Sequence, residues 1–353
     1  MPKWIGNRFG DIVPIAPGED APSGMYNMFD QYYSRQDNGW VTPVSMSGGT
    51  AFGPVSIDGA DRMVCRFRSP GTLTIEAGSA PNARILVVGG GGAGGSFNPG
   101  NYGGGGGGGG GVRYIPTISL PAGTYSISVG DGGTGGNPWS APKDGGAPAQ
   151  PKGGGTSSIF NPGDSNGVPA ITATGGGAGG VGGAAGGTGG SGGGESYPGP
   201  GGSGNAGGAE PRANPTSEGN NASNNKSGNS HGSYGCGGGG GANPTHPNTA
   251  HQTGNPGLTL PGVGSPGNPW LPPAGNVFGG GGGGSSYKET EGNGSGGPGG
   301  GGSAPGNDGV EYTGGGGGGT GTPTGNGGDG GYGVVYVICP YAEVPAANPG
   351  PGA

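Results

Sequence analysis

The chain has 353 residues, of which 106 are glycine and 36 are proline, and only 27% are hydrophobic. This composition excludes an ordinary side-chain core through the middle of the chain, the glycine runs exclude the Gly-X-Y period of collagen, and a charged fraction of 9% argues against a fully disordered chain. A net charge of −7 argues against a nucleic-acid partner, which would need a clustered basic face.

Residues 1–46 are rich in aromatic side chains and poor in glycine runs. Ser23 can cap a short helix that ends at Asn38-Gly39, with apolar side chains recurring every three or four residues. Such a helix is marginal alone, so its apolar face is expected to dock either on its own chain or a copy of it, or on another component of an assembly. The expected docking residues are Met25, Met28, Phe29, Tyr32 and Trp40.

After a linker predicted at 47–62, the pattern changes to short strands. Residues 63–68, 72–77 and 124–129 alternate between apolar and polar, whereas 85–88 and 334–338 are apolar on both faces, as in strands covered on both sides. These strands, with shorter candidates at 112–115, 157–160 and 170–174, predict an all-β fold, a small β-sandwich or jelly roll, over residues 63–339. Residues 340–353 form a tail rich in proline and alanine.

Glycine runs leave this predicted sandwich and return to it. Residues 89–95 follow one predicted strand directly, and residues 103–111 lead directly into the next strand. Residues 131–136 and 153–155 leave and re-enter the strands in the same way. The longest excursion begins after Thr174 and returns only at 327–331. Because glycine has no side chain to bury, the order of these runs must come from backbone N–H and C=O groups. We therefore expect an inserted bundle of polyglycine II helices, clamped by the sandwich at one end and closed by loops at the other.

The flanks of the glycine runs resemble the glycine-rich domain of bacteriophage tail proteins. The resemblance spans about residues 60–339 and is carried by 85–95, 123–130, 153–158, 172–177 and 331–337. Residues 23–33, followed by Gly39-Trp40, are similar to a short module that often precedes this domain in phage virion proteins. The resemblance implies a virion component involved in host attachment, and it transfers no catalytic residue.

What the resemblance implies is a tail fibre or tail-tip adhesin, assembled in the host cytoplasm and located in the virion tail. Its partners would be other tail proteins, bound through the N-terminal segment, and a glycan or outer-surface protein of the host. A homo-oligomer is expected, trimeric by analogy with phage fibres. The alternative is a purely structural tail or capsid decoration protein that binds no receptor. Membrane insertion is not expected, because no stretch has the roughly 20 apolar residues of a span.

Aromatic residues within the polar excursions are the candidates for receptor contact. The sequence Asn-Pro-Trp occurs twice, and a tryptophan in such a loop must either cap the end of the bundle or be presented to a partner. Both interpretations stay open, as they do for the tyrosines in neighbouring loops. The candidates are Trp139, Tyr197, Tyr234, Trp270 and Tyr287, and Tyr312 shares the same ambiguity.

Other motifs indicate no enzyme chemistry. The G-x-G-x-x-G at 89–94 lacks a following helix and an acidic residue about 20 positions later, so no nucleotide cofactor is expected. Three cysteines far apart in the sequence suit reduced thiols. A metal site is possible by ligand type alone, but the spacing fits no standard zinc module, and a polar loop is the preferred interpretation. The residues concerned are His231, Cys236, His246 and His251.

Overall fold

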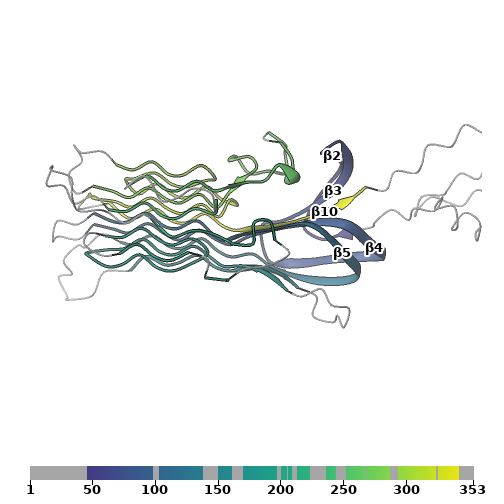
Figure 1. The fold of residues 1–353 in the computed structure, drawn as a ribbon, viewed down its shortest axis with the longest axis horizontal. Helices are drawn as coiled ribbons and strands as arrows, with labels where there is room; N and C mark the ends of the chain where they lie inside the picture. Colours follow the sequence, from purple (N-terminus) through teal and green to yellow (C-terminus); the bar gives the residue numbers. More distant parts are fainter. Residues whose placement is uncertain are drawn as a thin grey trace, which may run out of the picture.

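The protein, described by a computed structural model, is elongated, with a β-sheet at one end and a bundle of extended glycine-rich threads at the other (Figure 1). The threads of this glycine bundle are residues 89–97, 103–111, 130–137, 150–155, 174–180, 186–196, 236–241, 252–257, 279–286, 293–304, 314–320 and 325–333. The structure describes residues 46–97, 103–137, 150–160, 170–196, 200–204, 206–208, 213–222, 236–243, 252–265, 267–286, 293–322 and 325–341.

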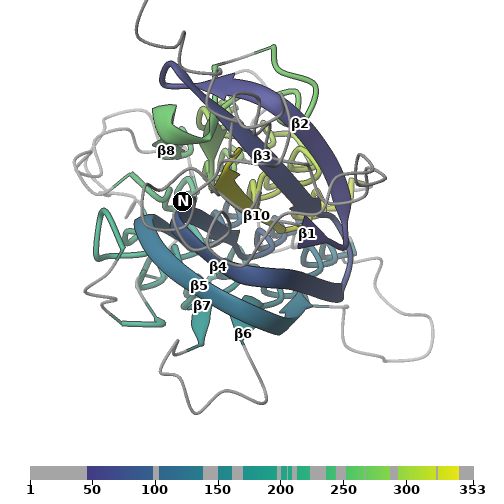
Figure 2. The same ribbon diagram turned by 90° about the vertical axis from the view of Figure 1, so that its right-hand side faces the viewer.

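Eight strands form one antiparallel sheet in the order β2-β3-β10-β4-β5-β6-β7, with β1 paired to β4. The fold is all-β, as expected from the sequence, and its antiparallel sheet curves so strongly that it nearly closes (Figure 2). Its strands are β1 (Met46–Ser47), β2 (Thr50–Ile57), β3 (Ala60–Phe67), β4 (Gly71–Val88), β5 (Val112–Ser128), β6 (Ser157–Phe160), β7 (Ile171–Ala173) and β10 (Val334–Pro340).

The central strand β10 is buried on both faces. Val335 and Val337 pack into one apolar cluster with side chains of β3, β4 and β5, whereas Val334 and Tyr336 pack into a second cluster on the opposite face. Alternate residues of a strand point to opposite faces, so this short apolar run builds both cores at once. The prediction that residues 85–88 and 334–338 are covered on both sides is confirmed.

The second face is covered by a segment that the sequence analysis did not identify as structured. It contains the short strands β8 (Leu258–Thr259) and β9 (Val277–Phe278), which pair with each other, and the 3₁₀ turn η2 (Pro261–Val263). Its buried apolar side chains are Leu260, Val263, Trp270, Leu271 and Phe278. These widely spaced residues have neither strand nor helix periodicity, which is why pattern alone did not find them.

The predicted linker at 47–62 is wrong, because this range contains β2 and the start of β3, paired in antiparallel register. The two strands are joined by Asp58-Gly59, both at positive φ (54° and 76°), the backbone geometry of a tight hairpin turn. Gly53-Pro54 interrupts the ladder between Phe52 and Val55, and this break conceals the alternation expected of a strand. The Asp58-Gly59 dipeptide, which favours a hairpin turn, was the sequence signal that could have revealed the two strands.

Several other expectations concern residues outside the described part of the chain. The N-terminal helix and its docking residues Met25, Met28, Phe29, Tyr32 and Trp40 lie there, as does most of the 340–353 tail. Within the described ranges, no helix is long and apolar enough to cross a membrane.

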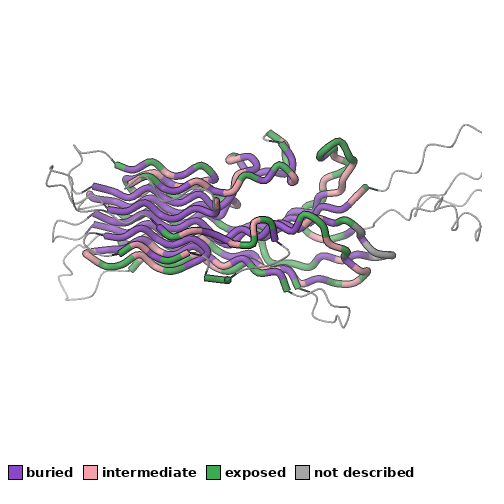
Figure 3. Tube along the Cα trace, in the orientation of Figure 1, coloured by how far each residue is buried: buried purple, intermediate pink, exposed green. Residues whose placement is uncertain are grey.

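In the glycine bundle, hydrogen bonds repeat every third residue. Along residues 89–95, the N–H groups of Gly89, Gly92 and Gly95 donate to the thread 103–111, at 2.8–2.9 Å. The intervening N–H groups donate alternately to residues 150–155 and to residues 325–331. Each thread can therefore bond several neighbours at once, which a β-strand with its two edges cannot do. The interior of the bundle is buried almost throughout (Figure 3).

The thread 103–111 lies at the centre and bonds to six others. Its N–H groups donate to 314–320, 174–180 and 237–240, and its carbonyls accept from 89–95, 191–194 and 282–285. Every residue from Gly103 to Gly111 is buried. The prediction that main-chain hydrogen bonds take the place of a side-chain core in this run is confirmed.

All three cysteines are buried and none of them forms a disulfide, as expected for reduced thiols. Burial raises the pKa of the Cys65 thiol to about 11, and burial together with nearby Cys65 raises that of Cys339 to about 12, from an ordinary value of 9.0. Both thiols lie in the core of the sheet.

Because these folded-state pKa values are raised, stability is complete below pH 9 and declines as the pH rises, since unfolded thiols ionise while folded ones stay protonated. We expect the free energy of unfolding to fall by about 1.4 kcal/mol per pH unit for each thiol between pH 9 and 11. Urea denaturation across this range measures the slope. Cys339→Ala should reduce the slope, and an unchanged slope in this variant would contradict the assignment.

Candidate functional site

The end of the glycine bundle opposite the sheet, here called the tip, is the candidate site. Thread 103–111 runs from the tip at Gly103 to β5 at Val112. The ends of other threads meet at Gly103: Ser196 Oγ and Cys236 Sγ both donate to its carbonyl oxygen at 2.9 Å. Ser285 Oγ both accepts from the N–H and donates to the carbonyl of Gly104, each at 3.0 Å. Short side chains thus close the lattice where backbone partners end.

The described chain starts and finishes at the opposite end, in β1 and β10 (Figure 1). Several thread ends therefore lie at the tip, held by a hydrogen-bonded bundle away from the point where the chain enters and leaves the fold. Binding residues are disproportionately found on loops positioned by a rigid scaffold. The segments between these thread ends include 98–102 and 287–292, which lie outside the described residues.

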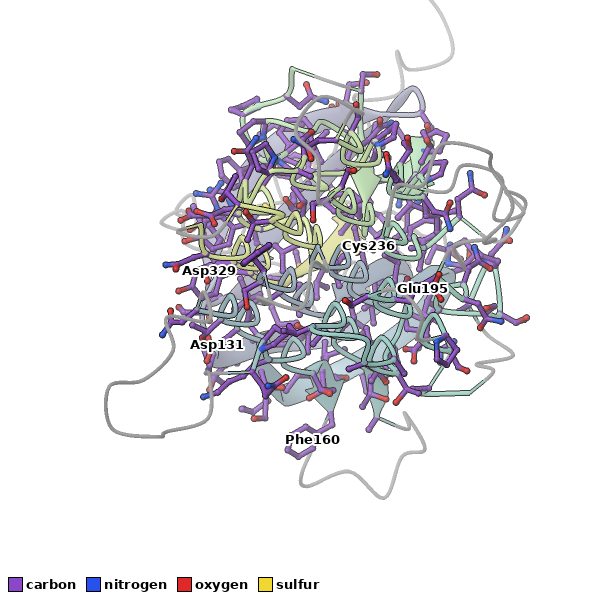
Figure 4. All side chains as sticks on the ribbon, turned by 90° about the vertical axis from the view of Figure 1, so that its left-hand side faces the viewer. Asp131, Phe160, Glu195, Cys236 and Asp329 are labelled. Carbon is purple, nitrogen blue, oxygen red and sulfur yellow. The ribbon has the colours of Figure 1, made fainter. Side chains whose placement is uncertain are left out.

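Viewed from the tip, side chains gather around the outside of the bundle, and Asp131 and Asp329 lie at one edge (Figure 4). Two exposed carboxylates there satisfy backbone N–H groups: Asp329 accepts from Gly135 at 2.6 Å, and Asp308 accepts from Asp329 at 2.8 Å. Glu195 and Cys236 instead lie within the bundle and are buried. The charged residues along this edge therefore complete the lattice at its boundary.

Most predicted contact residues lie outside the described part of the chain, namely Trp139, Tyr197, Tyr234 and Tyr287. Trp270 is described, and it lies against the sheet, where it is 4% exposed. Its ring packs against that of Phe52, with 6.4 Å between the ring centroids, and its Nε1 donates to the carbonyl of Val263 at 2.9 Å. Its own carbonyl accepts from Arg66 and from the Tyr336 hydroxyl.

The expectation that Trp270 contacts a receptor is therefore wrong in the structure of this chain, because the ring and its polar atom are both used internally. Trp270 does not cap the far end of the bundle either, because it belongs to the apolar cluster on the second face of the sheet. A buried tryptophan with a satisfied N–H is typical of a core position.

The metal-ligating candidates are not brought together among the described residues. Cys236 is fully buried, and its thiol contacts the carbonyl of Gly103. His231, His246 and His251 lie outside the described ranges. Within those ranges no group of three or more histidine, cysteine or acidic side chains could hold a metal ion.

Two features at the surface were not predicted. Tyr312 and Tyr332 stack with ring centroids 6.0 Å apart, and the guanidinium of Arg68 lies 4.4 Å from the centre of the Tyr312 ring. Tyr332 is 42% exposed, so the stack lies at the surface, and Val310 is a further exposed apolar residue at 36%. The stacking joins residues far apart in the sequence, and no local pattern indicated it.

The second feature is a pocket of about 300 Å³ at the tip, lined by Ser286, Asn293, Pro305, Gly321 and Thr322. Ser286 and Gly321 are buried and form its floor, whereas Asn293 and Pro305 are exposed at its rim. The sequence analysis did not identify any of these residues as part of a site. The ends of three threads, 279–286, 293–304 and 314–320, create the pocket, so no linear motif marks it.

No curated protein sequence matches the chain at a significant level. A family model described as a glycine-rich domain matches residues 68–340, which begin at the end of β3 and finish at the end of β10. The match thus covers β4, β5, β6, β7 and β10 together with the whole described glycine bundle, whereas β1, β2 and β3 precede it. The chain belongs to the glycine-rich domain family.

Proposed function

We propose that this protein is a phage virion structural protein, a tail fibre or tail-tip adhesin that holds binding loops against the surface of a host cell. The observation that carries the proposal is the position of the thread ends, which meet at the tip of a rigid bundle while the chain enters and leaves at the sheet. This arrangement suits a component anchored at one end and in contact with a partner at the other. The recognised partner would be a surface glycan or an outer-surface protein.

In this proposal the threads are polyglycine II helices. The three-residue repeat of the hydrogen bonds supports that geometry, since such a helix has three residues per turn and directs its backbone groups outward. A bundle of this kind holds loops without a hydrophobic core, so loop sequences can change while the support stays the same. That property suits an attachment protein whose target varies.

Residues 1–46 would join the protein to other tail components, with assembly in the host cytoplasm and a trimeric state by analogy with phage fibres. A second candidate function is structural decoration of the particle. The exposed side chains of Val310 and Tyr332 favour it, because they could pack against a neighbouring subunit.

The test places a short charged peptide tag at the tip, between Phe97 and Gly103, or, as a matched control, at the Asp58-Gly59 turn of the sheet. Adsorption to host cells of phage that carry each version is then measured. We expect the tip tag to reduce adsorption at least tenfold and the turn tag to leave it near normal. Normal adsorption with both tags, together with normal particle assembly, would contradict the attachment role and support decoration.

A further inference from the structure

The pocket at the tip has the size and placement of a small-ligand site. Its volume of about 300 Å³ lies at the lower end of the usual range for ligand pockets. It sits where threads 279–286, 293–304 and 314–320 end, and its floor is held by hydrogen bonds of Ser285 with Gly104 and of Gly104 with Thr320. Its walls are therefore part of the lattice.

The chemistry of the pocket is neutral and polar. Its five lining residues offer two hydroxyls, one amide and a proline ring, and none of them carries a charge. Gly321 leaves part of the floor without a side chain, so a ligand can approach the backbone closely. The hydroxyl of Thr322 lies 3.1 Å from that of Thr320, which fixes its position.

Ser286 supplies an independent indication of a ligand. The residue is 1% exposed, and its Oγ has no hydrogen-bond partner within the described part of the chain. Buried hydroxyls in native proteins are nearly always bonded, so an unpaired one deserves a specific explanation. Ser285, its neighbour, makes two hydrogen bonds with Gly104, and the lattice at this point therefore does not require a second serine.

We propose that this pocket binds a neutral hydroxylated ligand the size of one hexose ring, as presented by a surface glycan. Ser286 would exchange a hydrogen bond with a ring hydroxyl, Asn293 and Thr322 would bond hydroxyls at the rim, and Pro305 would pack against the apolar side of the ring. This inference rests on the proposed attachment function for the source of the ligand, and it names the class of group recognised.

The experiment uses saturation-transfer NMR with the full chain and separate solutions of glucose, galactose, N-acetylglucosamine and glucuronate. We expect transfer to at least one neutral sugar and little to glucuronate. Ser286→Ala should weaken the binding about fivefold, the value of one net hydrogen bond. The same variant should unfold at the same or a higher temperature, because it removes an unpaired buried hydroxyl.

Ser295→Ala is the matched control, since Ser295 is exposed on the neighbouring thread and does not line the pocket. It should bind as the unchanged protein does. If Ser286→Ala fails to fold, Thr322→Val, which keeps the shape of the side chain and removes its hydroxyl, must weaken binding instead. Absence of transfer to every neutral sugar, or unchanged binding by the pocket variant that folds, would overturn the proposal.

Host adsorption separates this inference from the attachment role. If the tip tag reduces adsorption but Ser286→Ala does not, the attachment role is supported and the role of the pocket in attachment is contradicted. If the protein binds a sugar but the tip tag leaves adsorption unchanged, the pocket proposal is supported and the attachment role is contradicted.

Discussion

Replacing Gly107 by alanine is expected to lower the free energy of unfolding by about 3 kcal/mol or more, the upper range for overpacking a dense interior. A Cβ at this position would lie 2.1 Å from the carbonyl oxygen of Gly92 and 2.6 Å from its carbonyl carbon. Both atoms belong to the backbone of the next thread, so no side-chain rotation can relieve the clash. A single methyl group must therefore push two threads apart.

The displacement has further consequences, because Gly107 is bonded to other threads as well. Its N–H donates to Gly317 and its carbonyl accepts from Gly282, both at 2.8 Å. Moving the thread away from Gly92 strains these bonds, and nothing apolar is available to compensate for them. Chemical denaturation followed by circular dichroism measures the loss of stability.

Gly71→Ala is the matched control for this substitution. Gly71 begins β4, and a Cβ there would meet the Phe67 ring at 3.6 Å and the carbonyl oxygen of Ser69 at 4.0 Å, both ordinary contacts. We expect a change within about 1 kcal/mol, because alanine also restricts the unfolded chain. Equal effects of the two substitutions would show that close approach between threads is not what requires glycine.

The strands of the sheet were predictable because their residues carry a local period. The strands at 85–88, 112–115, 157–160 and 334–338 were all located, and burial of the last on both faces followed from its unbroken apolar run. The pairing of glycine threads followed from the obligation of backbone groups to find partners. In both cases the prediction depends only on neighbouring residues or on the backbone groups that each residue carries.

Features made by distant residues were not predictable in the same way. The hairpin at 50–67 was concealed by Gly53-Pro54, and the cover formed by residues 258–278 has no period. Trp270 illustrates the problem, because a Pro-flanked tryptophan in a polar segment is typical of a loop, and only tertiary contacts bury it. The pocket around Ser286 likewise arises where three separate threads end, so no local pattern marks it.

A buried ion pair that no motif indicated joins strand β5 to residues 213–222. Arg113 on β5 and Glu218 are 2% and 0% exposed in their side chains, with 3.5 Å between Nη2 and Oε2. Arg113 also donates to the carbonyls of Thr172, Gly208 and Thr216. The carboxylate accepts from the N–H groups of Thr174 and Gly207. The pair therefore fixes β7 and the first residue of the following thread to segments distant in sequence.

Glu218→Gln is expected to lower the free energy of unfolding by about 3 to 5 kcal/mol, the usual effect of leaving one partner of a buried pair without its counter-charge. The substitution preserves the shape of the side chain but removes the negative charge beside Arg113. In addition, an amide can satisfy only one of the two backbone N–H groups, since its second terminal atom is itself a donor. Urea denaturation and hydrogen exchange at Thr174 measure the effect.

The same chemical change in an exposed ion pair gives the control. Asp58 lies 2.6 Å from Arg84 and its side chain is 50% exposed, so solvent screens the pair. Asp58 also has a φ of 54°, which asparagine adopts readily, and Asp58→Asn therefore leaves the turn intact. We expect a loss of no more than about 1 kcal/mol. A comparable loss in both variants would mean that burial does not set the strength of the Arg113–Glu218 pair.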